Sequence, residues 1–319
     1  MMELSTTLFE NSMLTRCLML FLVSALPASA AHAQLIGWKL CEVRADGTGF
    51  RVLCEAPETG GIGTPSFSAD GKTIVIEETH IGRRWQAKFL RSDSRNTSLR
   101  FLDAANPEIS PYVLPGQRLA SMPSFSPGGH RVAFTVPNIG TVCVMRRDFA
   151  DVIQLAQAAS GAVWSPDGRK IAFANRNNGN ALEIYDLVED EQYSVTNPLV
   201  RTVKLGFCWS PDSKWLAFSG YRKNGGGAVI ARVRADAGER ETEVLLPSVS
   251  ADRVSWHPDG SKLVFSDQKP DRHHLYLIDA LRPSETPTEV AGIPKSLSAA
   301  VPTWSPDGKR IVFIGLPAN

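Results

Sequence analysis

The sequence predicts an all-β fold, a six-bladed β-propeller of four-stranded antiparallel blades, and three observations support this prediction. First, one short phrase occurs six times, each copy beginning at a large aromatic residue: Phe67, Phe125, Trp164, Trp209, Trp256 and Trp304. Second, successive aromatics lie 39 to 58 residues apart, and periods of about 40–50 residues are typical of propeller blades. Third, apolar residues follow each aromatic at offsets of seven and nine positions, as on one face of a β-strand.

A tight polar turn follows the aromatic in each copy, as in Trp164-Ser165-Pro166-Asp167-Gly168. Proline sets φ for a turn, aspartate accepts a nearby N–H, and glycine tolerates positive φ. This chemistry predicts a hairpin between the first two strands of each blade. Gly128 replaces the aspartate in the second copy and Ser213 replaces the glycine in the fourth. Both are turn-forming residues, so we expect these blades to form as well.

Alternating apolar segments, such as 182–186 and 275–279, follow most copies and predict the outer strands of the blades. The sixth copy has no such segment, because the chain ends at Asn319, whereas a hairpin at 40–44 and 50–54 precedes the first copy. We therefore expect this hairpin to join the C-terminal strands and close the ring, which removes exposed sheet edges. The irregular segment 91–121 is interpreted as an insertion on the first blade, either a lid or partner contact or a surface loop.

The repeated Trp-Ser-Pro-Asp-Gly followed by Lys/Arg-Ile-Ala-Phe resembles the WD-like repeats of the TolB-like six-bladed β-propellers, from about Leu35 to Gly315. Propellers of this family serve as periplasmic interaction modules, as noncatalytic domains of serine peptidases and as scaffolds of some polysaccharide lyases. TolB itself carries an additional α/β domain before its propeller. The residues before Leu35 are too few for such a domain, so the TolA-contacting role of TolB is not expected here.

The N-terminal residues have the features of a cleavable secretory signal. Arg16 precedes an apolar run, Cys17 to Leu26, and small residues lead to a cleavage position after Ala33. The run is too short to span a membrane, which disfavours the alternative of an uncleaved anchor. We predict a signal peptide at 1–33, with Met13 as an alternative start, and a single propeller at 34–319. The mature protein is expected to be periplasmic or secreted, without stable membrane insertion.

The formal net charge of +1 argues against general nucleic-acid binding through bulk electrostatics. Cys41 and Cys54 fall opposite each other if the hairpin turns between Gly47 and Thr48. In an oxidising compartment they could form a cross-strand disulfide, and otherwise they are small buried apolar side chains. A closed ring leaves no free sheet edge, so we expect a monomer.

Catalytic signatures are missing from the sequence. There is no Gly-x-Ser-x-Gly elbow, P-loop, dinucleotide fingerprint or Cys-x-x-Cys pair. A metal site joining His80 and His273 is disfavoured, because the adjacent His273 and His274 would point to opposite faces of a strand. We therefore predict no catalytic residues, no metal and no cofactor. The channel is expected to be lined by the small, uncharged residues that precede each aromatic: Ser66, Ser124, Val163, Cys208, Ser255 and Thr303.

The loops between the second and third strands emerge on one rim of a propeller, and here they contain more bases than acids. Arginine and aromatic side chains suit an anionic or polyhydroxylated ligand, or an acidic protein segment. The alternative is an ordinary solvated loop set. The predicted binding residues are Arg83, Arg84, Trp85, Arg176, Tyr221, Arg222, Lys223, Arg272 and His273. The predicted function is an exported module of the cell envelope that binds an unidentified envelope protein or anionic ligand. The alternative is a polysaccharide lyase or hydrolase that uses the channel.

Overall fold

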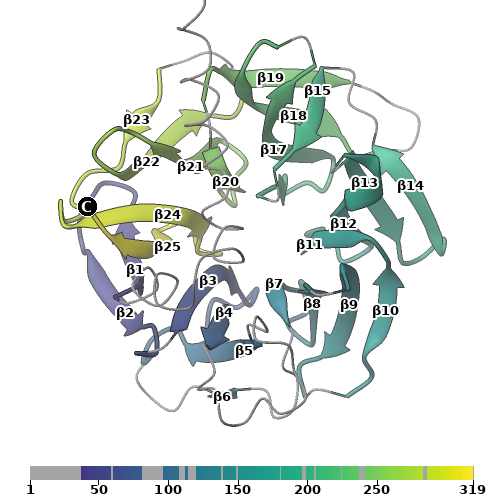
Figure 1. Ribbon diagram of the computed structural model, residues 1–319, viewed down its shortest axis with the longest axis horizontal. Coiled ribbons are helices and arrows are strands. Elements are labelled where there is room, and N and C mark those ends of the chain that lie inside the picture. Colours follow the sequence, from purple (N-terminus) through teal and green to yellow (C-terminus); the bar gives the residue numbers. More distant parts are fainter. Residues whose placement is uncertain are drawn as a thin grey trace, which may run out of the picture.

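The computed structural model describes residues 37–58, 60–80, 96–107, 112–113, 120–137, 139–148, 150–179, 181–195, 199–204, 206–223, 225–236, 241–249, 251–282 and 286–318. The predicted signal peptide and the predicted binding residues Arg83, Arg84 and Trp85 lie outside these ranges. The strands form six antiparallel sheets around a common centre (Figure 1). The predicted six-bladed β-propeller is therefore confirmed.

We number the blades along the chain. From the centre outwards, blade 1 consists of β3 (Gly60–Phe67), β4 (Thr73–His80), β5 (Asn96–Asp103) and β6 (Tyr112–Val113). Blade 2 consists of β7 (Ser121–Phe125), β8 (Arg131–Val136), β9 (Thr141–Arg146) and β10 (Ile153–Ala156). Blade 3 consists of β11 (Ala159–Trp164), β12 (Lys170–Asn175), β13 (Ala181–Asp186) and β14 (Glu191–Val195). The segment expected to be an insertion on the first blade thus supplies its two outer strands, and that interpretation was wrong. The strand β5 was not recognised because its sequence, NTSLRFLD, has no regular apolar alternation.

Blade 4 has a divided innermost strand. Blade 4 consists of β15 (Val200–Val203) and β16 (Cys208–Trp209), followed by β17 (Trp215–Arg222), β18 (Ala228–Arg234) and β19 (Thr242–Pro247). Blade 5 consists of β20 (Ala251–Trp256), β21 (Lys262–Gln268), β22 (His273–Asp279) and β23 (Thr288–Glu289). Blade 6 consists of β24 (Leu297–Trp304), β25 (Arg310–Pro317), β1 (Lys39–Arg44) and β2 (Arg51–Glu55). In blade 4 both β15 and β16 pair with β17.

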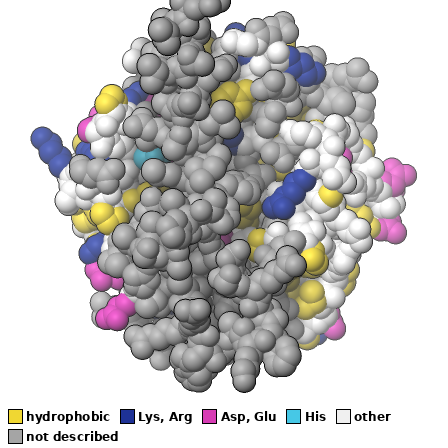
Figure 2. Space-filling view, viewed as in Figure 1, with side chains coloured by type: hydrophobic (Ala, Val, Ile, Leu, Met, Phe, Trp, Pro, Cys, Tyr) yellow, Lys and Arg dark blue, Asp and Glu magenta, His cyan; other side chains and the backbone are white. Residues whose placement is uncertain are grey.

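The ring closes where the two ends of the chain meet in blade 6. β1 pairs antiparallel with β25 along its whole length, from Lys39 opposite Gly315 to Arg44 opposite Arg310 (Figure 1). This pairing confirms the predicted closure. On the face shown in Figure 2, most visible Asp and Glu side chains lie towards the outer edge, whereas Lys and Arg side chains are also seen nearer the middle.

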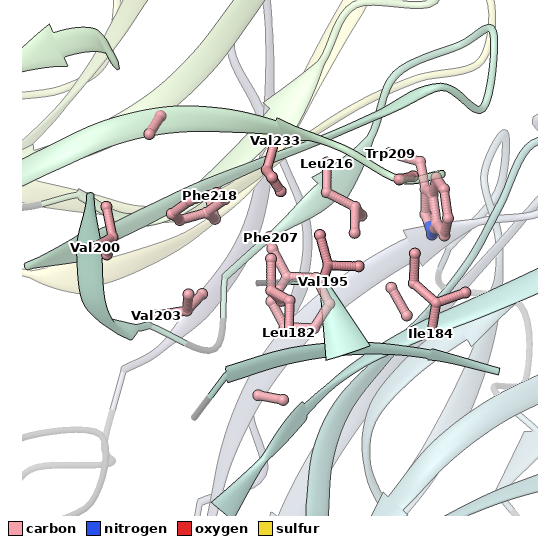
Figure 3. Close-up of a cluster of buried hydrophobic side chains, with 14 of the residues drawn as sticks. Leu182, Ile184, Val195, Val200, Val203, Phe207, Trp209, Leu216, Phe218 and Val233 are labelled. Carbon is pink, nitrogen blue, oxygen red and sulfur yellow. The ribbon is translucent and has the colours of Figure 1, made fainter. Parts of the chain in front are cut away.

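The core consists of apolar clusters that each join two neighbouring blades. The residues seven and nine positions after each repeat aromatic are at most 1% exposed, as in Ile171 and Phe173. One cluster packs Leu182 and Ile184 of blade 3 against Trp209 and Phe218 of blade 4 (Figure 3). Burying each such side chain stabilises the fold by roughly 1.5–3 kcal/mol. The repeat aromatics are therefore structural, as their spacing indicates.

The repeated turn is held by a serine and an aspartate two residues apart. In blade 3 the Ser165 hydroxyl donates to Asp167 at 2.6 Å and accepts the Lys170 N–H at 2.8 Å, while Asp167 accepts the Arg169 N–H at 3.0 Å. The same serine–aspartate bond recurs in three other blades: Ser68 to Asp70, Ser210 to Asp212 and Ser305 to Asp307. The recurring polar residues of the phrase therefore build the hairpin.

The cysteines of the N-terminal hairpin do not face each other. A β-bulge between Leu40 and Cys41 shifts the register, so that Cys54 lies opposite Leu40 and Cys41 lies opposite Val52. Cys41 packs into the core towards blade 5, and Cys54 packs on the other side of the sheet, towards blade 1. Both thiols are free, and the expected opposition of the two cysteines was wrong.

Within the described residues, no helix combines the length and the hydropathy that a membrane span requires.

Candidate functional site

The connections between the second and third strands lie on one side of the ring, because successive strands of a blade run in opposite directions. In the described part of the chain these connections are residues 137–140 without 138, 176–179, 223–227 without 224, and 269–272. We call these connections, together with Arg222 at the end of β17, the loop rim. The equivalent connection of blade 1 falls outside the described residues, together with Arg83, Arg84 and Trp85.

On blade 3, Arg176 begins a 3₁₀ turn, Arg176–Asn178, whose cap is Asn175. The Asn175 side chain accepts the Asn177 N–H at 2.9 Å, and the Arg176 N–H donates to the Ala158 carbonyl at 2.7 Å. Its backbone is thus fixed at both sides. The Arg176 side chain is exposed, and its Nε lies 3.4 Å from the Ser160 hydroxyl.

On blade 4, Arg222 and Lys223 are adjacent cations at the end of β17. The Arg222 N–H donates to the Gly227 carbonyl at 3.0 Å, and the Lys223 N–H donates to the Leu199 carbonyl at 3.1 Å. A Cβ on Gly226 would lie 2.8 Å from Cδ of Arg222. This glycine therefore makes room for the arginine stem, so the glycine run at the hairpin tip has a packing role. Lys223 is exposed and Arg222 is partly exposed.

Among the described residues, three rim cations have no acidic partner. Within the described residues, no carboxylate forms an ion pair with Arg176, Arg222 or Lys223. By contrast, Lys269 on blade 5 pairs with Asp267 at 2.6 Å. Within the ranges that the structure describes, no ion pair therefore compensates the charge of these three cations.

On blade 5, Arg272 is held inside the protein. Its Nη1 donates to the carbonyls of Pro294 at 2.8 Å and Leu297 at 2.7 Å, and its side chain is 12% exposed. These two hydrogen bonds hold the blade 5 loop against the beginning of β24, the innermost strand of blade 6. The neighbouring His273 donates its backbone N–H to the Ser298 hydroxyl at 2.8 Å.

A charged cluster joins blades 4 and 5 beside the rim. The Lys204 ammonium lies 3.8 Å from Asp252 and 5.7 Å from the centre of the Tyr221 ring. The other oxygen of Asp252 lies 3.2 Å from Nδ1 of His273. Lys204 and Asp252 thereby link Tyr221 and His273, two of the residues that the sequence predicted.

Sequence reasoning missed Lys204 and Asp252, although the repeat contains a signal for both. Lys204 lies five positions before its aromatic, where the other five copies have the uncharged residues Ile62, Ala120, Ala159, Ala251 and Ala299. Asp252 lies four positions before its aromatic, where the other copies have the uncharged residues Gly63, Ser121, Ser160, Leu205 and Ala300. Charged exceptions to the repeat therefore mark the junction of blades 4 and 5.

The residues before the aromatics hold adjacent blades together. The hydroxyls of Ser66, Ser124 and Ser255 accept the backbone N–H of the aromatic in the next blade at 3.1 to 3.2 Å. Thr303 donates to the Pro65 carbonyl at 3.1 Å. Most of these residues are partly exposed beside the central axis, as expected, but their hydroxyl groups are used in the fold.

Glu77 is a partly exposed carboxylate between blades 1 and 2. Desolvation raises the pKa of Glu77 to about 7, although the Met122 N–H, which donates to its Oε2 at 3.2 Å, acts in the opposite direction. No cation pairs with this carboxylate among the described residues. Nor do the described ranges hold a group of three His, Cys, Asp or Glu side chains placed to bind a metal ion.

The fold and the rim define a class of protein: a six-bladed β-propeller, closed by its terminal strands, with a basic loop rim. It is structurally similar to TolB propellers. A protein provisionally named TolB from Agrobacterium tumefaciens superimposes with a TM-score of 0.68 at 18% identity, over 88% of this chain and 98% of that one. TolB from Acinetobacter baumannii gives a TM-score of 0.61 at 17% identity, over 89% of this chain and 65% of that one.

The likeness extends to propellers from other settings. A chain of the nidogen/laminin complex gives a TM-score of 0.58 at 13% identity, over 88% of this chain and 99% of that one. At such identities the comparisons establish the fold alone. No protein-family model matches the sequence, and neither does any curated protein.

Proposed function

We propose that this chain is an exported binding module of the cell envelope, and that its loop rim at blades 3 to 5 binds an anionic partner. The observation that carries the proposal is the set of three rim cations without an internal acidic partner in the described ranges: Arg176, Arg222 and Lys223. Unpaired surface cations attract an oppositely charged partner and raise its rate of association.

The rim cations are held on fixed backbone, which favours binding. Each of the three donates its backbone N–H to a backbone carbonyl: Arg176 to Ala158, Arg222 to Gly227 across the same hairpin, and Lys223 to Leu199. Less conformational entropy is therefore lost when a partner binds than would be lost for a free loop. Tyr221 adds an aromatic face, a side-chain type enriched at protein interfaces together with arginine.

Export is proposed from the N-terminal sequence features and from the fold likeness to TolB. Cell fractionation of the full-length chain, followed by N-terminal sequencing of the mature form, tests this part. We expect a mature chain that begins at Gln34 and is found in the periplasm or the medium. A full-length chain retained in the cytoplasm would overturn the proposal of export.

The binding surface is tested by affinity capture from an envelope extract of the source cells. The double charge reversal Arg222→Glu/Lys223→Glu is compared with Lys262→Glu/Lys309→Glu. The control changes the same charge at two exposed lysines near the repeat turns, on the opposite side of the ring. We expect partners with acidic surfaces to be retained by the native protein and the control and lost by the rim variant. Equal retention by both variants would contradict a binding role for the rim.

A further inference from the structure

Arg253 is a charged exception on the innermost strand of blade 5. It lies three positions before Trp256, where the other copies have the uncharged residues Thr64, Met122, Gly161, Gly206 and Val301. It belongs to the irregular stretch of β20 between the pairs Ala251–Asp267 and Val254–Phe265. Four of its counterparts at this repeat position have positive φ: Thr64, Met122, Gly161 and Val301. In five blades the position lies on the innermost strand, beside the central axis, and in blade 4 it lies between β15 and β16.

Blade 4 makes room for Arg253. A Cβ on Gly206 would lie 2.5 Å from Cα and 2.8 Å from Cβ of Arg253, and 2.2 Å from the Asp252 carbonyl oxygen. Only glycine fits where the backbones of the two blades come this close together. The Val254 N–H donates to the Gly206 carbonyl at 3.2 Å there. The arginine is thus seated closely between the innermost strands of blades 4 and 5.

Arg253 is one of several partly exposed residues on the innermost strands. Partly exposed residues occur on the innermost strands of all six blades: Thr64, Met122, Val163, Cys208, Arg253, Ser255, Val301 and Thr303. These strands surround the axis (Figure 1). We call the region that these innermost strands surround the central channel; Arg253 lies on one of these strands and is partly exposed.

Arg253 has no counter-ion within the described residues. The adjacent Asp252 is shared by Lys204 and His273. The nearby thiol of Cys208 is neutral, because desolvation raises its pKa to about 12. Desolvation also lowers the pKa of Arg253 itself, which reflects how closely the protein surrounds the guanidinium.

We propose that Arg253 binds a carboxylate group that enters the central channel. A guanidinium withdrawn from water without a partner is unfavourable, and an incoming carboxylate would supply the missing negative charge. The planar guanidinium can bind both oxygens of a carboxylate at once. The small, uncharged neighbours Ser255 and Thr303 leave Arg253 as the charged recognition group of this wall. Arg253 lies on the innermost strand of blade 5, whereas the three rim cations lie on blades 3 and 4.

The test uses acetyl-Gly-Gly-Glu-Gly-Gly-amide, its Gln twin and free glutarate as probes, with binding measured by calorimetry. Wild type is compared with Arg253→Gln and with the control Arg131→Gln, which removes an exposed arginine. Phenylglyoxal modification of Arg253 in the wild-type protein, read by peptide mass spectrometry, gives a second measurement that needs no variant. Binding of glutarate alone would identify free carboxylates as the ligand source, and binding of the Glu peptide alone would identify an inserted chain.

We expect a carboxylate probe to bind wild type and Arg131→Gln at least tenfold more tightly than Arg253→Gln, because charge-assisted bonds are lost. We also expect that probe to slow the modification of Arg253. Equal binding by Arg253→Gln, or an unprotected Arg253, would overturn the proposal. If Arg222→Glu/Lys223→Glu abolishes binding while Arg253 stays unprotected, the carboxylate binds the rim; this site then fails and the proposed function stands.

Discussion

The hydroxyl of Ser124 accepts the backbone N–H of Trp164 at 3.2 Å, across the boundary between blades 2 and 3. Ser124 lies just before the repeat aromatic of its own blade and bonds to the repeat aromatic of the next. The phrase therefore has two roles: it builds each blade, and it connects that blade to its neighbour beside the axis.

Replacing Ser124 with alanine should destabilise the ring. Ser124 is buried, so the Trp164 N–H would lose its acceptor, at a cost of about 1–3 kcal/mol. Urea unfolding measures the change, with the exposed Ser296→Ala as control. Equal midpoints for the two variants would show that the bond between the blades contributes nothing to stability.

The second blade offers a stabilising change, because Gly128 stands where other copies have aspartate. Gly128 does not have positive φ, and the atom nearest to an added Cβ would be Cδ2 of His130, at 3.5 Å. Gly128→Asp should supply the missing acceptor for the Ser126 hydroxyl and the His130 N–H. We expect it to be about 1 kcal/mol more stable than Gly128→Ala, which changes only the chain entropy. Thermal unfolding of both variants measures the difference, and a less stable aspartate variant would contradict this account of the turn.

The blades could be predicted from the sequence because their apolar offsets and turn residues repeat in phase, and the closure followed from the unpaired hairpin at 40–54. Two details could not. The outer strands of blade 1 lack a regular apolar alternation, and the bulge at Leu40/Cys41 changes the register without a glycine or proline to mark it. The register of a strand depends on its packing against both neighbouring blades, and the sequence of that strand alone does not specify this packing.

The buried positions of Cys41 and Cys54 lead to a prediction about the reactivity of their thiols. Burial raises the pKa of Cys41 to about 12 and that of Cys54 to about 11, so both thiols are neutral at pH 8. Only the thiolate is nucleophilic. We therefore expect both to react slowly with a thiol reagent in the folded protein and rapidly after unfolding. A non-reduced mass that shows the loss of two hydrogens, with both cysteines in one cross-linked peptide, would contradict the opposite-face placement.

Glu77 should make stability depend on pH. Its folded pKa of about 7 lies above the ordinary 4.5, so the stability it contributes below pH 4.5 is lost as the pH rises through 7. Glu77→Gln stays neutral and can still accept the Met122 N–H. At pH 8 we expect the variant to be more stable than wild type by up to about 3 kcal/mol. Urea unfolding between pH 5 and 8 tests this, with the exposed Glu58→Gln as control; parallel profiles for wild type and Glu77→Gln would contradict it.

The candidate site was only partly predictable. Arg222 and Lys223 could be found because rim loops follow from the repeat, and they lie on the rim as expected. Arg272 also lies there, but its guanidinium is used by two backbone carbonyls, a contact between loops that the sequence does not reveal. Lys204, Asp252 and Arg253 were missed because a charged residue just before a repeat aromatic becomes informative only when the six copies are aligned.

Site-specific photo-crosslinking in the source cells tests the central claim most directly. A photoreactive amino acid is placed at Lys223 on the rim and, in a second protein, at Lys309 near the opposite turns. Both positions are exposed, so the two proteins sample opposite sides of one ring. We expect Lys223 to yield a discrete cross-linked partner with an acidic contact segment, and Lys309 to yield none. Cross-links from Lys309 alone, or the same products from both positions, would contradict binding through the loop rim.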